Sequence, residues 1–182
     1  MKKPDWKLWL KDKDECKLWL GNYTKKQILR KDKDESSIYL KKSEHNLNLA
    51  NWINDKHNNE IPQVFGNEAF YDWAIVIYYY AVYHAALALV SKLKYKTKSH
   101  AAAICFLIHY YYHRRKIVDE EDIELAATSL SGEDIETLTA AKSMRERASY
   151  DVHAVFEKTI AEDAKAKSAK FLNKVREVLE KL

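Results

Sequence analysis

The sequence contains very little glycine and proline, with three Gly and two Pro among 182 residues. Proteins built on β-sheets need many tight turns made with these two residue types, so their scarcity argues against β and α/β classes and favours long helices. The only two cysteines, Cys16 and Cys105, are isolated in the sequence and provide neither a disulfide framework nor the spacing of a zinc site. Cys105 lies in an apolar run, and we expect it to be a reduced residue of the core.

The sequence also lacks the apolar stretch of a secretion signal near its first residues, MKKPDW. One segment, residues 69–90, is long and apolar enough to be tested as a membrane span. It contains Asp72, His84 and five tyrosines, which are costly or misplaced inside the hydrocarbon of a bilayer. We therefore expect a buried core helix here, in a cytoplasmic protein with no membrane partner.

The residues that are present suit a folded domain, with 47% hydrophobic and 32% charged residues. The net charge of +4 is mildly basic and does not by itself indicate nucleic-acid binding. The hydrophobic pattern predicts an all-α protein, an up-and-down antiparallel helical bundle with four to five main helices. The expected helices cover, in chain order, 34–57, 67–93, a start at Thr97 or Ser99 to 112, a short 119–128, 131–150 and 159–181.

The first of these helices has apolar or weakly polar residues at helical spacing, and we expect this face to pack on the core. The face comprises Ile38, His45, Leu49, Trp52 and Ile53. The segment 58–62 (NNEIP) should end the helix, because Pro and clustered Asn disfavour its continuation.

The N-terminal part repeats a motif: 11–20 (KDKDECKLWL) recurs as 31–40 (KDKDESSIYL). Two copies are too few for a solenoid, and the apolar runs fit either short strands or an amphipathic helix. The alternating charges make poor phosphate binders and indicate solvated turns. We interpret residues 1–32 as an N-terminal extension, with Trp6, Trp9 and Trp19 as its packing residues, and residues 33–182 as the bundle. The sequence leaves open whether the extension folds onto its own chain or reaches a partner.

Two further segments carry a family resemblance. The first is 79–89 (YYAVYHAALAL), followed by 98–100 (KSH); the second is 145–151 (RERASYD). Together, and in this order, they resemble signatures of the small prokaryotic branch of the HEPN superfamily of helical bundles, with Ser149 where that branch usually has Asp. The resemblance covers about 35–182, and residues 1–32 have no counterpart in it. It implies contact with RNA or a nucleotide. The supporting or binding candidates are Tyr80, His84, His100, Arg145, Tyr150 and Asp151.

Many HEPN proteins are metal-independent RNases, often toxins, with an Arg followed after four to six residues by a His. Arg147 and His153 have five residues between them. A neutral His is able to take the proton of an RNA 2′-hydroxyl, and an Arg to hold the scissile phosphate, without metal or cofactor. Six positions on a helix place two side chains about 240° apart, so the pair does not share a face. The resemblance implies that two such motifs meet across a homodimer.

Other readings of this segment stay open. Arg145, rather than Arg147, matches the small prokaryotic branch, and Ala148 stands where active members carry a polar residue. If the pair has no catalytic role, Arg147 and His153 form the polar end of a helix, with Arg145 and Arg147 paired to Asp151 or Glu146. The protein would then be a non-catalytic nucleotide- or partner-binding module beside a minimal nucleotidyltransferase, in a toxin–antitoxin pair. A helical protein–protein adaptor without a small-molecule site is the third reading.

The remaining histidines give no metal site in the sequence. His84 lies on the apolar face of its helix, where a lone His is more often a core residue than a ligand. His109 and His113 have the i, i+4 spacing that suits a metal, but no third ligand is evident, and we expect none to bind.

Overall fold

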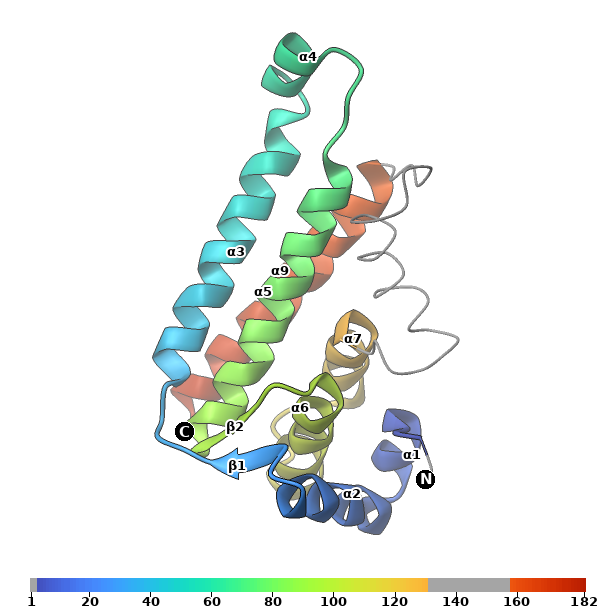
Figure 1. The fold of residues 1–182 in the computed structure, drawn as a ribbon, viewed down its shortest axis with the longest axis vertical. Helices are drawn as coiled ribbons and strands as arrows, with labels where there is room; N and C mark the ends of the chain where they lie inside the picture. The colour runs from blue at the N-terminus through green and yellow to red at the C-terminus, as the bar shows by residue number, and fades with distance from the viewer. Residues whose placement is uncertain (1–2, 131–157) are drawn as a thin grey trace.

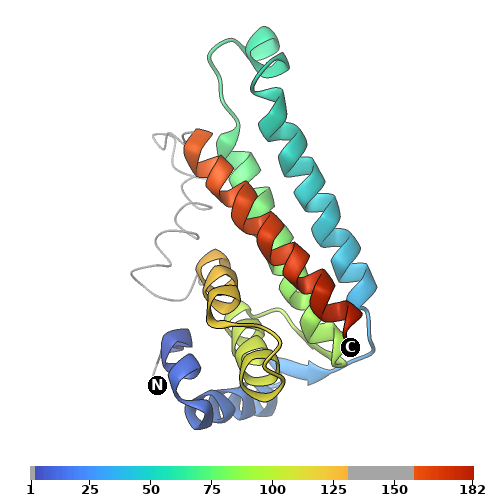
Figure 2. The same cartoon turned by 180° about the vertical axis from the view of Figure 1, so that it is seen from behind.

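The computed structural model describes residues 3–130 and 158–182, which form a mostly helical protein (Figures 1 and 2). Three long helices lie side by side: α3 (Ser36–Lys56), α5 (Tyr71–Lys92) and α9 (Lys158–Glu180). The short α4 (Glu60–Phe65) closes the hairpin between α3 and α5. The prediction of an all-α helical bundle is confirmed.

A second group of short elements lies around the other end of these helices (Figure 1). In chain order it comprises α1 (Trp6–Lys11), α2 (Lys13–Lys25), β1 (Leu29–Lys31), β2 (Tyr95–Thr97), α6 (His100–Leu107), η1 (Ile108–Arg114) and α7 (Glu120–Leu130). β1 and β2 pair in antiparallel register, with Leu29 opposite Thr97. The expected helix 131–150 lies outside the described residues.

The prediction that neighbouring helices run antiparallel is met by one pair of the long helices but not by another. α3 and α5 run antiparallel, as a short connection requires. α9 starts beside the first turns of α5 and runs in the same direction as α5, antiparallel to α3 (Figures 1 and 2).

Local sequence explains where several helices begin. Asp5 caps α1 by accepting from the Leu8 N–H at 3.1 Å, and Asp12 caps α2 by accepting from the N–H groups of Asp14 and Glu15. Ser99 caps α6 through the Ala102 N–H at 3.3 Å, so Ser99 rather than Thr97 is the helix start.

The buried face of α3 differs from the predicted one. Ile38, Leu49 and Trp52 are 62%, 41% and 58% exposed. The face toward α5 consists instead of Ser43, Asn46, Leu47, Ala50 and Asn54. The physical reason is that small side chains let two helices approach closely, and the Ser43 hydroxyl donates to the Ala81 carbonyl of α5 at 2.7 Å.

α5 is the central helix of the described chain, because it contacts α3, α9, α6, α7 and β2. It is the one described helix whose length and hydropathy would suit a membrane span. However, 72% of its apolar window is buried inside the protein, as in the core helix of a soluble protein. The expectation that this segment is a core helix agrees with that burial.

The helix that begins at His100 was expected to continue regularly to residue 112, but its character changes at Ile108. From Ile108 to Arg114 it has wider π-type turns, and the Arg115 N–H donates to the Tyr110 carbonyl at 3.2 Å. This geometry buries His109 and Tyr111 together, and the Tyr111 hydroxyl donates to the Leu89 carbonyl at 2.7 Å.

The apolar runs of the repeated N-terminal motif form helices rather than strands. The N-terminal extension folds onto its own chain. Trp6 and Trp9 are buried in the same core cluster as the helices of the bundle, and Trp19 packs against it. The Trp9 and Trp19 rings lie 5.6 Å apart, and Nε2 of His113 donates to the Trp9 carbonyl at 2.8 Å. The extension is thus held by both apolar contacts and a hydrogen bond.

Candidate functional site

The proposed catalytic pair lies outside the described residues. Arg145, Arg147, Tyr150, Asp151 and His153 all belong to the segment 131–157, whose placement the structure does not describe. The candidates that it does describe are Tyr80, His84 and His100.

The structure brings the two parts of the first resemblance signature together. His100 is the first residue of α6, and its ring packs on α5, 4.4 Å from the Tyr83 ring and 5.7 Å from the Tyr79 ring. The Tyr79 hydroxyl lies 3.0 Å from Nδ1 and 3.1 Å from Nε2 of His100. We refer to Tyr79, Tyr80, Tyr83, His84 and His100 as the Tyr–His cluster.

His84 is held in a defined orientation within this cluster. Its Nδ1 lies 2.7 Å from the Tyr80 carbonyl oxygen, to which only a protonated Nδ1 is able to donate. The Asn46 amide nitrogen of α3 lies 3.2 Å from the same Nδ1. With the proton on Nδ1, the lone pair of the neutral ring is on Nε2, which becomes the hydrogen-bond acceptor of the site.

Burial and charge keep His84 neutral. The pKa of His84 is lowered from 6.5, mainly because the half-buried ring is desolvated, and to a lesser extent by the positive charge of Lys42. The Tyr80 carbonyl acts in the opposite direction. Burial also raises the pKa of the Tyr83 hydroxyl, with smaller effects of Tyr39 and Tyr80, so this hydroxyl stays a donor at neutral pH. His84 therefore offers an acceptor nitrogen in the same cluster as the neutral Tyr83 hydroxyl.

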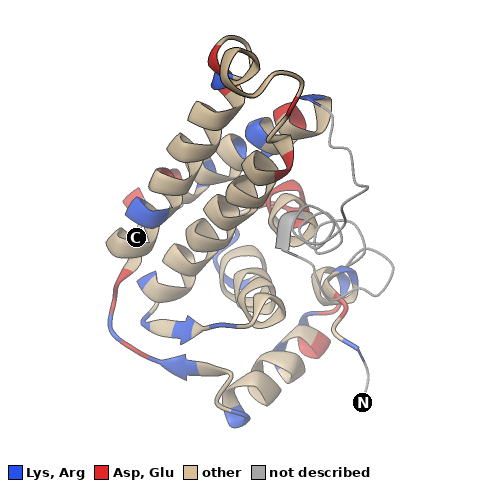
Figure 3. Cartoon of the chain, turned by 45° about the horizontal axis from the view of Figure 1, so that its top comes forward, with Lys and Arg blue, Asp and Glu red and all other residues tan. Residues whose placement is uncertain are grey.

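Positively charged residues lead directly into this cluster. The basic ribbon is the group of cations on and beside the paired strands, Arg30, Lys31, Lys33, Lys94, Lys96 and Lys98. Most of these side chains are exposed, and Figure 3 shows Lys and Arg along both strands. Lys96 pairs with Asp32, Lys33 pairs with Glu35 at 2.9 Å, and the Lys31 ammonium lies 3.9 Å from the Tyr95 ring centroid. Lys98 is two residues before His100, so the ribbon and the cluster are continuous along the chain.

Sequence reasoning missed the basic ribbon. Residues 31–35 (KDKDE) alternate in charge and were interpreted as solvated turns. The ribbon exists because β1 pairs with β2 and places a second set of cations beside the first. A signal was present in 92–98 (KLKYKTK), where lysine recurs at every second position, the spacing that places side chains on one face of a strand.

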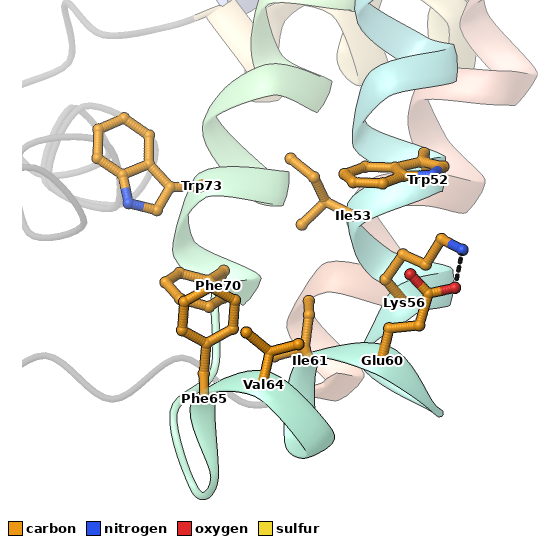
Figure 4. Close-up of a pocket in the computed structure, with 9 residues that line it drawn as sticks. All are labelled: Trp52, Ile53, Lys56, Glu60, Ile61, Val64, Phe65, Phe70 and Trp73. Atoms are coloured by element: carbon orange, nitrogen blue, oxygen red, sulfur yellow. Dashed lines mark hydrogen bonds and ion pairs between the residues drawn. The ribbon is translucent and has the colours of Figure 1, made fainter.

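A separate apolar pocket of about 390 Å³ lies at the opposite end of the long helices, between α4 and the adjoining ends of α3 and α5 (Figure 4). It is lined by Trp52, Ile53, Lys56, Glu60, Ile61, Val64, Phe65, Phe70 and Trp73. Lys56 and Glu60 pair with each other at its rim, and the rest of its lining is apolar. Trp52, which the sequence pattern placed in the core, lines this pocket instead. The pocket offers shape and apolar surface but no acid–base pair beyond that ion pair.

The described histidines and carboxylates do not gather into a metal site. Within residues 3–130 and 158–182 there is no group of three His, Cys, Asp or Glu side chains able to hold a metal ion. His109 is buried in the core, whereas His113 donates to the Trp9 carbonyl.

No protein-family model matches the sequence, and no curated protein is significantly similar to it.

Proposed function

We propose that this protein is a HEPN-like helical bundle that binds RNA or a nucleotide through the basic ribbon and the Tyr–His cluster. The observation that carries the proposal is the contact of His100 with Tyr79 and Tyr83, at the point where the cations of β2 lead into α6. Cations attract the phosphate groups, and exposed aromatic rings provide surfaces on which bases stack.

In its most specific form the proposal is a metal-independent endoribonuclease. Arg147 holds the scissile phosphate and His153 takes the proton of the 2′-hydroxyl, in a site composed by two copies of the chain. The Arg-x5-His spacing within the resemblance supports this form. We propose, with it, a cytoplasmic homodimer that acts as the toxin of a prokaryotic toxin–antitoxin pair.

The cleavage test compares the wild-type protein with Arg147→Ala and His153→Ala on single-stranded and structured RNA in EDTA. We expect cleavage by the wild type and a loss of at least about 100-fold in each variant, since acid–base catalysis by His153 and electrostatic stabilisation by Arg147 each typically contribute that much. Binding without cleavage would instead support the non-catalytic module beside a minimal nucleotidyltransferase, which Ala148 and Ser149 favour. Cleavage that both variants retain would rule out the assigned roles.

The binding test removes three cations of the basic ribbon, in the variant Arg30→Gln, Lys94→Gln, Lys98→Gln. Each lost contact to a phosphate of single-stranded RNA should lower the slope of log affinity against log salt by about 0.7. The matched control removes three exposed lysines of α1 and α2, Lys11, Lys13 and Lys17, and should leave that slope unchanged. Equal effects in the two triple variants would show that only the net charge matters. If the protein binds neither RNA nor a nucleotide, the hypothesis of a helical protein–protein adaptor remains.

A further inference from the structure

The two cysteines, isolated in the sequence, face each other in the core. Cys16 of α2 and Cys105 of α6 are 89 positions apart and both fully buried, with their sulfur atoms 3.9 Å from each other. Each sulfur also lies close to the carbonyl oxygen of the other residue, at 3.6 Å for Cys16 Sγ and 3.4 Å for Cys105 Sγ. These reciprocal contacts keep the two side chains directed at one another.

A buried histidine accompanies the pair. His109 lies in the π-type turns of η1, and its Nδ1 is buried without a hydrogen-bond partner among the described residues. π-type turns are frequent at functional sites, and each buried polar atom without a partner requires an explanation. His109 also bears on the cysteine pair, because it lowers the pKa of the Cys16 thiol.

The two thiols differ in their acidity. Hydrogen bonding to Cys105 lowers the pKa of Cys16 more than burial raises it, and His109 and His113 lower it further. Burial raises the pKa of Cys105. Cys16 is therefore the more acidic thiol of the pair and the one that attacks, whereas Cys105 keeps its proton.

We propose that Cys16 and Cys105 are a reversible redox pair, which a hydroperoxide converts into an intrachain disulfide between α2 and α6. The Cys16 thiolate attacks one oxygen of the peroxide, the O–O bond breaks, and Cys16 becomes a sulfenic acid while hydroxide or alkoxide leaves. The sulfur of Cys105 then attacks the sulfur of Cys16 and displaces its oxygen as water. Two electrons pass from the thiols to the O–O bond, and the two thiol protons end on the products.

The bond would join the N-terminal helices to the helix that carries His100. α1 and α2 pack on α6 and η1, and α2 also packs on β1. The disulfide would therefore hold this group of elements together. A covalent link across 89 positions restricts the unfolded chain, and the oxidised protein should melt higher than the reduced protein by roughly 5–15 °C.

The experiment treats the reduced full chain with hydrogen peroxide, then denatures it, alkylates the remaining thiols and measures the mass. We expect that neither cysteine is alkylated and that the mass lies about 2 Da below that of the reduced, unalkylated chain, because two hydrogens leave. Dithiothreitol should restore both thiols. Two thiols that persist, a stable gain of oxygen without loss of the pair, or a disulfide between chains would overturn the proposal.

Single variants test the separate roles of the two thiols. In Cys105→Ser, Cys16 has no second thiol to react with and should collect oxygen as sulfinic acid under the same treatment. In Cys16→Ser, Cys105 should stay reduced for longer, because it keeps its proton. The reverse order would contradict the assignment of Cys16 as the attacking thiol. The mass of the treated wild type decides the main proposal even if a variant fails to fold.

Discussion

His84 illustrates how the surroundings of one residue determine its chemistry. The sequence left it between a core residue and a binding residue. It is half-buried, its Nδ1 is used by the Tyr80 carbonyl, and Asn46 contacts it from α3. Burial and Lys42 both lower its pKa, so the ring is neutral at pH 7 with its lone pair on Nε2. Nε2 of His84 is therefore a hydrogen-bond acceptor, which under the proposed function would receive a ligand hydroxyl or a base edge.

The titration of His84 tests this view. We expect its pKa, followed by NMR of the ring, to lie below 6.5, and to rise in Lys42→Gln because a nearby positive charge is removed. Lys41→Gln is the control, since the neighbouring Lys41 is not among the groups that shift His84. Equal shifts in both variants would mean that overall charge, rather than Lys42, is responsible.

The same shift predicts a pH dependence of stability. The folded-state pKa of His84 lies below its unfolded value, so the unfolded chain binds more protons as the pH falls below 7. The contribution of His84 to folding stability is fully present above the pKa of the unfolded state, and it is lost as the pH falls through the pKa of the folded state. Urea unfolding between pH 7 and pH 5 should therefore show a smaller loss of stability in His84→Gln than in the wild type. A larger loss in the variant would reverse the sign and refute the shift.

The contact between α3 and α5 is made by small residues on one side and leaves large residues outside. Ser43 and Ala50 are fully buried and face α5, where Ala81 and Ala85 are also buried. Large apolar residues of α3, such as Trp52, lie on the opposite side or at the apolar pocket. The helix pair thus gains stability from close approach at these small residues, together with larger side chains such as Leu47 and Tyr78.

Overpacking this contact is expected to separate the two helices. Ala50→Leu should lower the free energy of unfolding by about 1–3 kcal/mol, because no space exists for the added atoms. Asn48→Leu places the same leucine side chain on the exposed side of α3 and should change stability by no more than about 0.5 kcal/mol. Urea unfolding of the two variants measures the difference. Similar stabilities would mean that position 50 has room that the structure does not show.

The described chain has one continuous core, which extends from the N-terminal helices to α9. Trp6, Trp9, Cys16 and Leu20 belong to the same cluster of buried residues as α5 and α6. The pairing of β1 with β2 adds a backbone connection between the N-terminal segment and the segment that joins α5 to α6. A protein with one core is expected to unfold in one transition.

Removing the largest N-terminal core side chain tests whether the protein unfolds in a single transition. Trp9→Ala should cost about 3–5 kcal/mol, as large buried aromatic residues do, and should shift the helix signal in circular dichroism as a single transition. Leu18→Ala on the exposed side of α2 should cost no more than about 0.5 kcal/mol. If most of the helix signal kept its wild-type midpoint in Trp9→Ala, the N-terminal helices would be a separate folding unit.

Local chemistry in the sequence was sufficient to predict the long helices, but it left α1 and α2 open between helix and strand and gave no sign of the π-type turns of η1. Few Gly and Pro residues, the Ser99 cap and the Asn- and Pro-containing segment 58–62 act over neighbouring positions, and α3, α5 and α6 begin or end close to where these signals lie. The same segment did not predict α4, because Pro62 is tolerated in the first turn of a helix.

Only the tertiary structure decided which residues meet. The buried face of α3, the pairing of β1 with β2, the approach of His100 to Tyr83 and the contact of Cys16 with Cys105 all join residues that are distant in the sequence. The spacing of apolar residues predicts that a helix has a buried and an exposed face. The partner helix determines which face is buried, because close packing can favour Ser43 and Ala50 over Ile38 and Trp52. The sequence by itself thus determined the helical class and the approximate bounds of α3, α5, α7 and α9, and the packing of the helices created the basic ribbon, the Tyr–His cluster and the cysteine pair.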